Sequence, residues 1–170
     1  MSYYSFQGRR TSRKVTYRRI PMNQQEQATV QAAIAILDKH LKQPGVAANS
    51  PEAIKQLLRL ALEAEEREVF FVLFMDSQLR LLSAEPLFYG TIDQAPVFPR
   101  EVARRALMLN AAALVIAHNH PSGNATPSEA DKRITKTLRT ALELFDVRLL
   151  DHFVVGSGKM TSFAEAGLMN

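Results

Sequence analysis

The apolar residues in the first quarter of the chain recur with a helical period. Between residues 23 and 41 they are spaced by three and four positions, which places them on one face of a helix. These positions are Val30, Ile34, Leu37 and Leu41. Pro44 and Gly45 follow, and they are typical of a chain that leaves a helix. The pattern predicts an amphipathic helix over 23–41 and then a linker.

A second amphipathic helix is predicted after that linker, which covers 45–49. Ser50 followed by Pro51 is a common helix start, because serine caps free backbone amides and proline suits the first helical position. The apolar positions then continue with Ile54, Leu57, Leu58, Ala61 and Leu62. The helix is expected to end near the acidic cluster at 63–66.

The pattern changes after residue 67 to short apolar runs that are typical of buried strands. EVFFVLFMD predicts a strand over 68–75, and a second pair of strands is expected across LRLLSAEPLFYGT at 79–91. AALVIAHN predicts a further strand at 112–119, and VRLLDHFVVG predicts the closing strand at 147–156.

Two helices are predicted between these strands. The first covers 99–110 and begins at a proline, and the second covers 126–145. In the second helix we expect Thr126 as the cap, Pro127 in the first position and Glu129 completing a capping box. The expected inward positions are Ile134, Leu138, Ala141, Leu142 and Phe145. Alternating strands and helices predict an α/β or α+β fold, with a mixed sheet flanked by helices.

Charge is concentrated at the N-terminus. The chain has a net charge of +4, whereas residues 1–20 alone carry +6, so residues 21–170 carry −2. The six cations are Arg9, Arg10, Arg13, Lys14, Arg18 and Arg19, and the same segment contains the aromatic residues Tyr3, Tyr4, Phe6 and Tyr17. Such a segment can neutralise phosphates and stack on bases, which indicates nucleic acid as a partner. A solvated flexible tail, ordered by an oligomer partner, is the alternative.

Composition limits the chemistry that is available. The sequence has no cysteine, so disulfides and thiolate ligands are excluded and a metal must be held by imidazole and carboxylate groups. No apolar segment approaches the roughly 18 residues of a membrane span, and no apolar leader begins the chain. We therefore expect a cytoplasmic protein without a membrane partner.

Two histidines lie at the end of a predicted buried strand. His118 and His120 are two residues apart, so the period of a strand puts both side chains on the same face. A turn follows, and the next helix begins with Ser128 and Asp131, which share one helical face. Two imidazoles and one carboxylate are the ligand set that leaves a fourth position open in a catalytic zinc site.

These residues resemble a known signature. His118-x-His120, seven residues and then Ser128-x-x-Asp131 resemble the JAMM (MPN/JAB-type) metallopeptidases, and AHNHPSGNATPSEAD resembles their RadC-like branch. GTID at 90–93 and LLDHFVVG at 149–156 resemble that branch too. The resemblance implies a cytidine-deaminase-like JAMM/MPN fold for residues 50–170, preceded by a basic arm at 1–20 and a helix with its linker at 21–49.

The resemblance also implies roles for the site residues. One zinc ion per chain would be held by His118, His120, Asp131 and a water, and Ser128 would hydrogen-bond the oxyanion of the reaction. The family's glutamate base opens an early apolar strand, which favours Glu68. The alternative is that Glu68 belongs to the charged end of the preceding helix, and Glu85 is the reserve candidate for the base.

Another histidine needs an assignment outside this signature. His152 follows Asp151 in the predicted closing strand, and it is either structural or a partner of a metal ligand.

Two functions follow from these observations. The first is a zinc-dependent hydrolase of the metallopeptidase or isopeptidase type, in which a glutamate activates metal-bound water to attack an amide carbonyl of a peptide or protein substrate. The family's better-known members cleave ubiquitin-like conjugates. The second is a non-catalytic, DNA-associated accessory protein of RadC type, with a role in DNA repair or mobile elements. The sequence leaves the substrate and the oligomeric state open.

Overall fold

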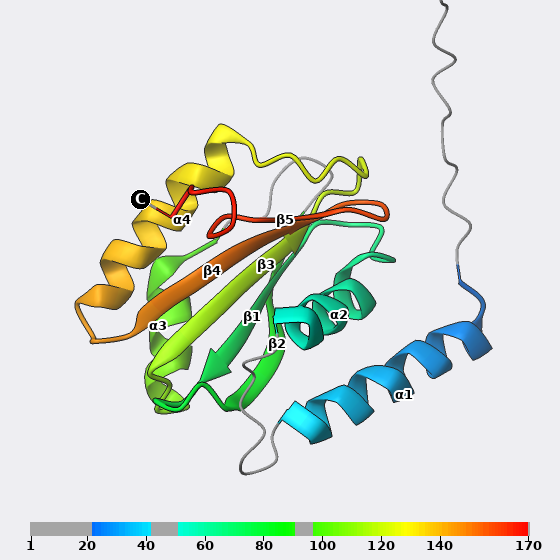
Figure 1. Ribbon diagram of the computed structural model, residues 1–170, viewed down its shortest axis with the longest axis horizontal. Helices are drawn as coiled ribbons and strands as arrows, with labels where there is room; N and C mark the ends of the chain where they lie inside the picture. Colours follow the sequence, from blue (N-terminus) through cyan, green and yellow to red (C-terminus); the bar gives the residue numbers. More distant parts are fainter. Residues whose placement is uncertain (1–21, 42–50, 91–96, 170) are drawn as a thin grey trace, which may run out of the picture.

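The computed structural model describes residues 22–41, 51–90 and 97–169 (Figure 1). The predicted basic arm at 1–20, the linker at 45–49, the Ser50 cap and most of GTID lie outside the described residues. Across the described ranges, none of the helices has the length and apolar character that a membrane span needs.

The centre of the fold is a mixed sheet in the order β2-β1-β3-β4-β5 (Figure 1). β3 and β4 are parallel, and the other neighbouring pairs are antiparallel. The strands are β1 (Val69–Met75), β2 (Leu81–Tyr89), β3 (Ala113–Asn119), β4 (Arg148–Val155) and β5 (Met160–Ser162). Within the described residues, four helices accompany them, namely α1 (Gln24–Leu41), α2 (Pro51–Leu62), α3 (Pro99–Met108) and α4 (Glu129–Glu143). The predicted mixed α/β sheet flanked by helices is confirmed, and it is consistent with the JAB/MPN fold.

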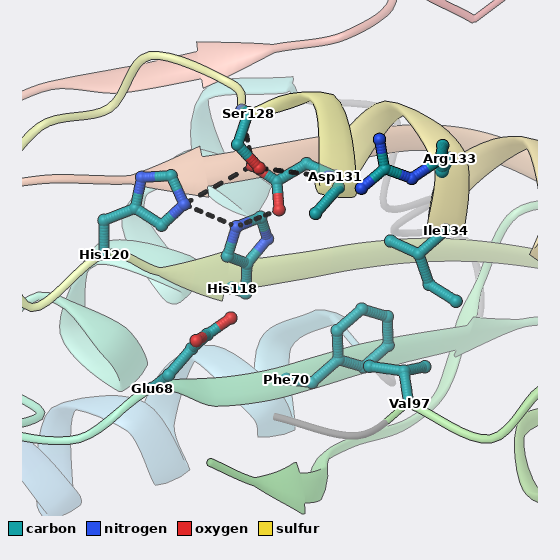
Figure 2. Close-up of a pocket in the computed structure, with 10 residues that line it drawn as sticks. Glu68, Phe70, Val97, His118, His120, Ser128, Asp131, Arg133 and Ile134 are labelled. Carbon is teal, nitrogen blue, oxygen red and sulfur yellow. Dashed lines mark hydrogen bonds and ion pairs between the residues drawn. The ribbon is translucent and has the colours of Figure 1, made fainter. Parts of the chain in front are cut away.

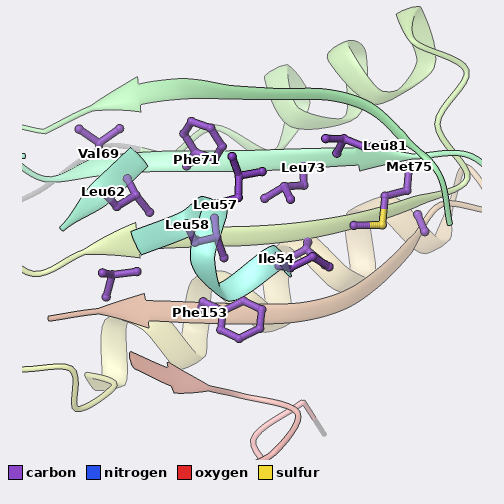
Figure 3. Close-up of a cluster of buried hydrophobic side chains, with 14 residues drawn as sticks. Ile54, Leu57, Leu58, Leu62, Val69, Phe71, Leu73, Met75, Leu81 and Phe153 are labelled. Carbon is purple, nitrogen blue, oxygen red and sulfur yellow. The ribbon is translucent and has the colours of Figure 1, made fainter. Parts of the chain in front are cut away.

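Helices cover both faces of this sheet. In β1, Val69, Phe71, Leu73 and Met75 pack in one apolar cluster with α2 (Figure 3). The alternate residues Phe70, Val72 and Phe74 pack in a second cluster with α3 and α4. All seven residues of β1 and all seven of β3 are buried, which explains why their sequences read as continuous apolar runs. The two-residue period therefore directs His118 to the α4 face and Asn119 to the α2 face.

The strand pair predicted at 79–91 is wrong, because these residues contribute one strand, β2. Among the strands that the structure describes, β2 lies at the edge of the sheet and pairs only with β1. Pro86 sits in this edge strand beside a register shift between Phe70 and Phe71. An edge position tolerates a proline that cannot donate to the ladder, so Pro86 produces an irregularity instead of a turn.

The predicted start of the helix at 126–145 is also wrong. Ser128 is the N-cap of α4, and its capping-box partner is Asp131. Thr126 instead hydrogen-bonds the Asn124 Oδ1 atom through both its backbone N–H and its hydroxyl, at 3.0 and 2.8 Å. Asn124 thus engages the predicted cap in a local turn, and the helix begins two residues later than expected.

Two further expectations fail at the C-terminal side. α4 ends at Glu143, so Phe145 lies beyond the helix and is 47% exposed instead of facing inward. The strand at 148–155 does not close the sheet, because β5 follows it and pairs antiparallel with residues 153–155. β5 has only three residues, which is too short for a hydrophobic period to reveal it.

Candidate metal centre

The candidate ligands come from β3 and from the beginning of α4. His118 is the sixth residue of β3 and points from the buried strand towards α4 (Figure 2). His120 lies just beyond the strand, where its backbone N–H still donates to the Val155 carbonyl of β4 at 2.9 Å. Asp131 lies in the first turn of α4 and is 8% exposed. The structure thus brings together the two histidines and the aspartate that the sequence predicted.

The three side chains converge on one point. His118 Nε2 lies 3.0 Å from His120 Nε2. Asp131 Oδ1 lies 3.2 Å from His118 Nε2, and Asp131 Oδ2 lies 3.4 Å from His120 Nε2. Zinc bonds of roughly 2.0–2.1 Å at tetrahedral angles would hold neighbouring ligand atoms about 3.3 Å apart. Each imidazole is therefore about that far from the other imidazole and from one oxygen of the carboxylate, and the three side chains form a candidate metal site.

The backbone of α4 fixes the direction of the Asp131 carboxylate. The Ser128 backbone N–H donates to Asp131 Oδ2 at 2.6 Å, and the Asp131 N–H donates to Ser128 Oγ at 3.1 Å. The N-terminal end of a helix also attracts negative charge. The capping box thus holds the carboxylate where it meets the two imidazoles.

The ring of His120 is oriented by the loop that follows it. His120 Nδ1 lies 2.7 Å from the Asn124 carbonyl oxygen. A carbonyl oxygen can only accept, so Nδ1 carries the proton of this hydrogen bond. In the neutral ring, Nε2 then presents its lone pair to the candidate site, as a metal ligand must.

The electrostatics of the cluster favour a bound cation. Burial opposes ionisation of Asp131, but hydrogen bonds with His118, His120 and Ser128 outweigh it and hold the pKa of this carboxyl well below its usual range. The hydrogen bond with Asp131 raises the pKa of His120. The carboxylate is therefore ionised at neutral pH, and the cluster attracts positive charge, as a proton or as a metal ion.

Glu68 faces the same cavity from the beginning of β1 (Figure 2). The cavity has a volume of about 450 Å³, and its wall includes the three candidate ligands and Ser128. Burial raises the pKa of Glu68, and the nearby His118 and His120 partly oppose this shift. A carboxylate whose pKa is raised towards neutrality is a better proton acceptor than an ordinary surface glutamate. The structure thus places Glu68 at the same cavity as the candidate ligands.

Glu85, the reserve candidate, lies elsewhere on β2. Its two carboxylate oxygens accept hydrogen bonds from the Arg105 guanidinium at 3.0 and 3.2 Å. The Ser83 hydroxyl donates to one of these oxygens at 2.8 Å. Glu85 does not line the cavity around the candidate ligands. The ion pair with Arg105 explains its place at the sheet edge.

Ser128 lines the cavity beside Asp131. Its hydroxyl oxygen accepts the Asp131 N–H, and this bond does not use the hydroxyl proton. The side chain can therefore cap α4 and still donate a hydrogen bond to a ligand in the cavity.

Asn119, to which the sequence analysis assigned no role, holds the segment that carries Glu68. Its Oδ1 accepts the Val69 N–H at 2.8 Å, and its Nδ2 donates to the Arg67 carbonyl at 2.9 Å. A third bond joins Nδ2 to the Glu65 carbonyl at 3.2 Å. The side chain is fully buried and bonds both neighbours of Glu68. The only feature of the sequence that bears on this role is the position of Asn119 in the strand, which directs its side chain to the face opposite the two histidines.

His152 also lies beside the candidate ligands. It is fully buried in β4, and its Nε2 lies 2.8 Å from His118 Nδ1. This position is compatible with both roles that the sequence left open, because the ring is buried in the core and also contacts the candidate ligand His118.

Comparisons with known proteins agree with this architecture. The profile of the RadC-like JAB domain matches residues 48–168. Over 148 residues the chain is 50% identical to the UPF0758 protein YkfG of Escherichia coli K12, and the alignment covers 87% of this chain and 94% of YkfG. It is 49% identical to YfjY of the same organism, with 84% and 89% covered.

Another relative is considerably longer than this chain. A UPF0758 protein of Leptothrix cholodnii is 60% identical over 121 residues, which cover 71% of this chain but 54% of that protein. Both the extent of the profile match and the coverage of the two Escherichia coli proteins place the described sheet and its candidate metal site within one family. The chain belongs to the RadC-like JAB domain family.

Proposed function

We propose that this protein is a metal-dependent hydrolase that cleaves an amide bond of a peptide or isopeptide substrate. The observation that carries the proposal is the convergence of His118, His120 and Asp131 at a cavity whose wall also contains Glu68 and Ser128. Three ligands leave one side of a tetrahedral metal open to that cavity, which is the pattern of catalytic rather than structural zinc sites.

The residues around the cavity supply the remaining parts of such a reaction. When bound, zinc would provide Lewis acidity towards a water molecule and a carbonyl oxygen. The Glu68 carboxylate accepts a proton from the attacking water and returns it to the leaving amine. The Ser128 hydroxyl donates to the oxyanion, an interaction whose removal costs about 2.7–4 kcal/mol in other enzymes.

The apolar part of the cavity wall indicates which substrate side chains would fit beside the candidate ligands. Phe70, Val97 and Ile134 line it, and Arg133 lies at the same side (Figure 2). An apolar wall of this kind favours an uncharged side chain or the aliphatic stem of a lysine next to the amide. This is compatible with a peptide and with an isopeptide substrate.

Metal content tests the proposal first. We expect untagged protein to retain about one zinc per chain after dialysis, and we expect His120→Ala and Asp131→Asn to retain almost none, because each change removes a ligand. Elemental analysis measures the content. Asp146→Asn is the matched control, because Asp146 is exposed and its φ of 56° is one that asparagine tolerates. Zinc retained equally by Asp131→Asn and Asp146→Asn would rule out the proposed site.

Nucleic-acid binding is proposed as a second function, on the charge of residues 1–20. These residues carry +6, whereas the rest of the chain carries −2. We expect the full chain to bind DNA with a log–log salt slope of up to about −5 if all six cations contact phosphates. Deletion of residues 1–20 should abolish binding, as measured by fluorescence anisotropy between 50 and 200 mM salt. A variant with the six cations changed to glutamine separates charge from stacking by the aromatic residues.

A hydrolase and a non-catalytic DNA-associated accessory protein predict opposite results for hydrolysis. DNA binding that depends on residues 1–20, together with no hydrolysis by zinc-loaded protein, would favour a non-catalytic accessory role. Binding that survives deletion would exclude the arm from this role.

A further inference from the structure

His152 is a fully buried polar side chain that the proposed reaction does not use. It lies in β4, stacked on Phe163 with ring centroids 4.6 Å apart and in an edge-to-face arrangement with Phe70 at 6.2 Å. Its two ring nitrogens each have one polar partner in the described structure, namely His118 and Thr135. A buried imidazole whose two nitrogens both have hydrogen-bond partners on other elements is held in a defined orientation.

The direction of these hydrogen bonds follows from the donors and acceptors. Thr135 Oγ1 lies 2.6 Å from the Asp131 carbonyl oxygen and 2.6 Å from His152 Nδ1. The carbonyl can only accept, so the single hydroxyl proton of Thr135 belongs to that bond. The hydroxyl oxygen must then accept from His152, and His152 carries a proton on Nδ1.

The same reasoning extends to His118. A charged imidazolium at the position of His152 would be buried between aromatic rings without a carboxylate in hydrogen-bond contact, which is costly. The neutral ring with a proton on Nδ1 has a lone pair on Nε2, and this atom lies 2.8 Å from His118 Nδ1. His118 must therefore donate from Nδ1, and in its neutral form this leaves its own Nε2 unprotonated and facing His120 and Asp131.

We propose that His152 and Thr135 are positioning residues, which hold His118 in the tautomer that can bind a metal and tie β3 to the first turn of α4. The chain of bonds starts at His118, passes through His152 and Thr135, and ends on the backbone carbonyl of Asp131. It thus connects two candidate ligands that belong to different elements. This inference rests on the proposed metal site, and it assigns no contact with substrate to either residue.

Zinc affinity is the primary test. We expect Thr135→Val, which removes the hydroxyl but keeps the shape, to weaken zinc binding by about 10–100-fold, the usual effect of losing a partner of a metal ligand. Thr135→Ser keeps the hydroxyl and should bind zinc as the unmodified chain does. Competition with a chromophoric chelator measures these affinities, and thermal unfolding of the metal-free proteins verifies that each variant folds.

α4 offers a matched control at Thr137. Its hydroxyl donates to the Arg133 carbonyl at 2.9 Å, the same bond to the preceding turn that Thr135 makes, but Thr137 is exposed. Thr137→Val should therefore leave zinc affinity unchanged. Equal affinities for Thr135→Val and Thr137→Val would overturn the proposal, as would equal losses in Thr135→Val and Thr135→Ser.

A spectroscopic measurement reads the tautomer directly. Long-range ¹H–¹⁵N correlation of the imidazoles should show the proton of His152 on Nδ1 in the unmodified chain, and Thr135→Val should shift it. A proton on Nε2 of His152 in the unmodified chain would reverse the direction of the hydrogen bonds and overturn the inference.

The two measurements separate this inference from the proposed function. If the unmodified protein binds no zinc, the metal site is wrong, and the tautomer of His152 in the metal-free protein still tests the direction of the chain. If it binds zinc and Thr135→Val binds it equally well, the positioning role is wrong and the metal site stands.

Discussion

Changing Glu68 to glutamine is expected to lower amide hydrolysis by a factor of about 10²–10⁴, the usual contribution of a general acid–base residue, and to leave the zinc content unchanged. Glutamine has nearly the same shape but cannot accept and return a proton at the cavity wall. The rate is measured on whichever peptide or isopeptide of a substrate panel the zinc-loaded protein hydrolyses, and the zinc content by elemental analysis.

The dependence of the hydrolysis rate on pH should also reflect the ionisation of Glu68. A general base must be ionised, and burial raises the pKa of Glu68. The rate of the unmodified chain should therefore fall on acidification at a pH above the range of an ordinary carboxyl group. This limb should be absent from the residual rate of Glu68→Gln.

Two other glutamates provide the controls. Glu66 is exposed, lies two residues before Glu68 and does not line the metal cavity, so Glu66→Gln should keep full activity. Glu85→Gln should lose part of the ion pair with Arg105 and keep its hydrolytic rate. Normal hydrolysis by Glu68→Gln together with a large loss in Glu85→Gln would reverse the assignment.

The candidate ligands could be found in the sequence because their spacing is set by local geometry. A strand puts His118 and His120 on one face, and a helix start puts Asp131 close to Ser128, whatever the rest of the fold does. The turn between them was harder to read. Thr126 and Ser128 both precede a helical pattern and both suit a cap, and only the hydrogen bonds to Asn124 decide against Thr126.

Residues whose role depends on contacts between a helix and a strand were harder to predict from the sequence. Thr135 lies in α4 and His152 in β4, and the contact between them depends on how helix and sheet pack. For His152 the sequence could only offer two roles. A threonine inside an amphipathic helix offers no reason to be singled out, since threonine hydroxyls commonly bond the preceding turn, as Thr137 also does. The contact between His152 and His118 also depends on the parallel register of β3 and β4, which places Ile116 opposite His152.

The other large effect is expected at Asn119, where alanine should lower the free energy of unfolding by about 3 kcal/mol. The change removes the partner of the buried Val69 N–H and one partner of the Arg67 carbonyl, and a buried polar group without a partner costs about 1–3 kcal/mol. Urea unfolding of the metal-free protein measures the loss. Asn119→Asp should be destabilised as well, because its second oxygen would face the carbonyls that the amide group now contacts.

Asn119 also separates the position of Glu68 from its chemistry. Because its bonds hold the residues on both sides of Glu68, Asn119→Ala should retain zinc but lose hydrolysis at a temperature where it is fully folded. Glu68→Gln should show the same loss of rate without any loss of stability. In the sequence His118-Asn119-His120, the outer residues would then serve the metal from one face of β3, and the middle residue would fix the base from the other. Full activity in folded Asn119→Ala would show that Glu68 keeps its place without this support, and the role of Asn119 would be confined to stability.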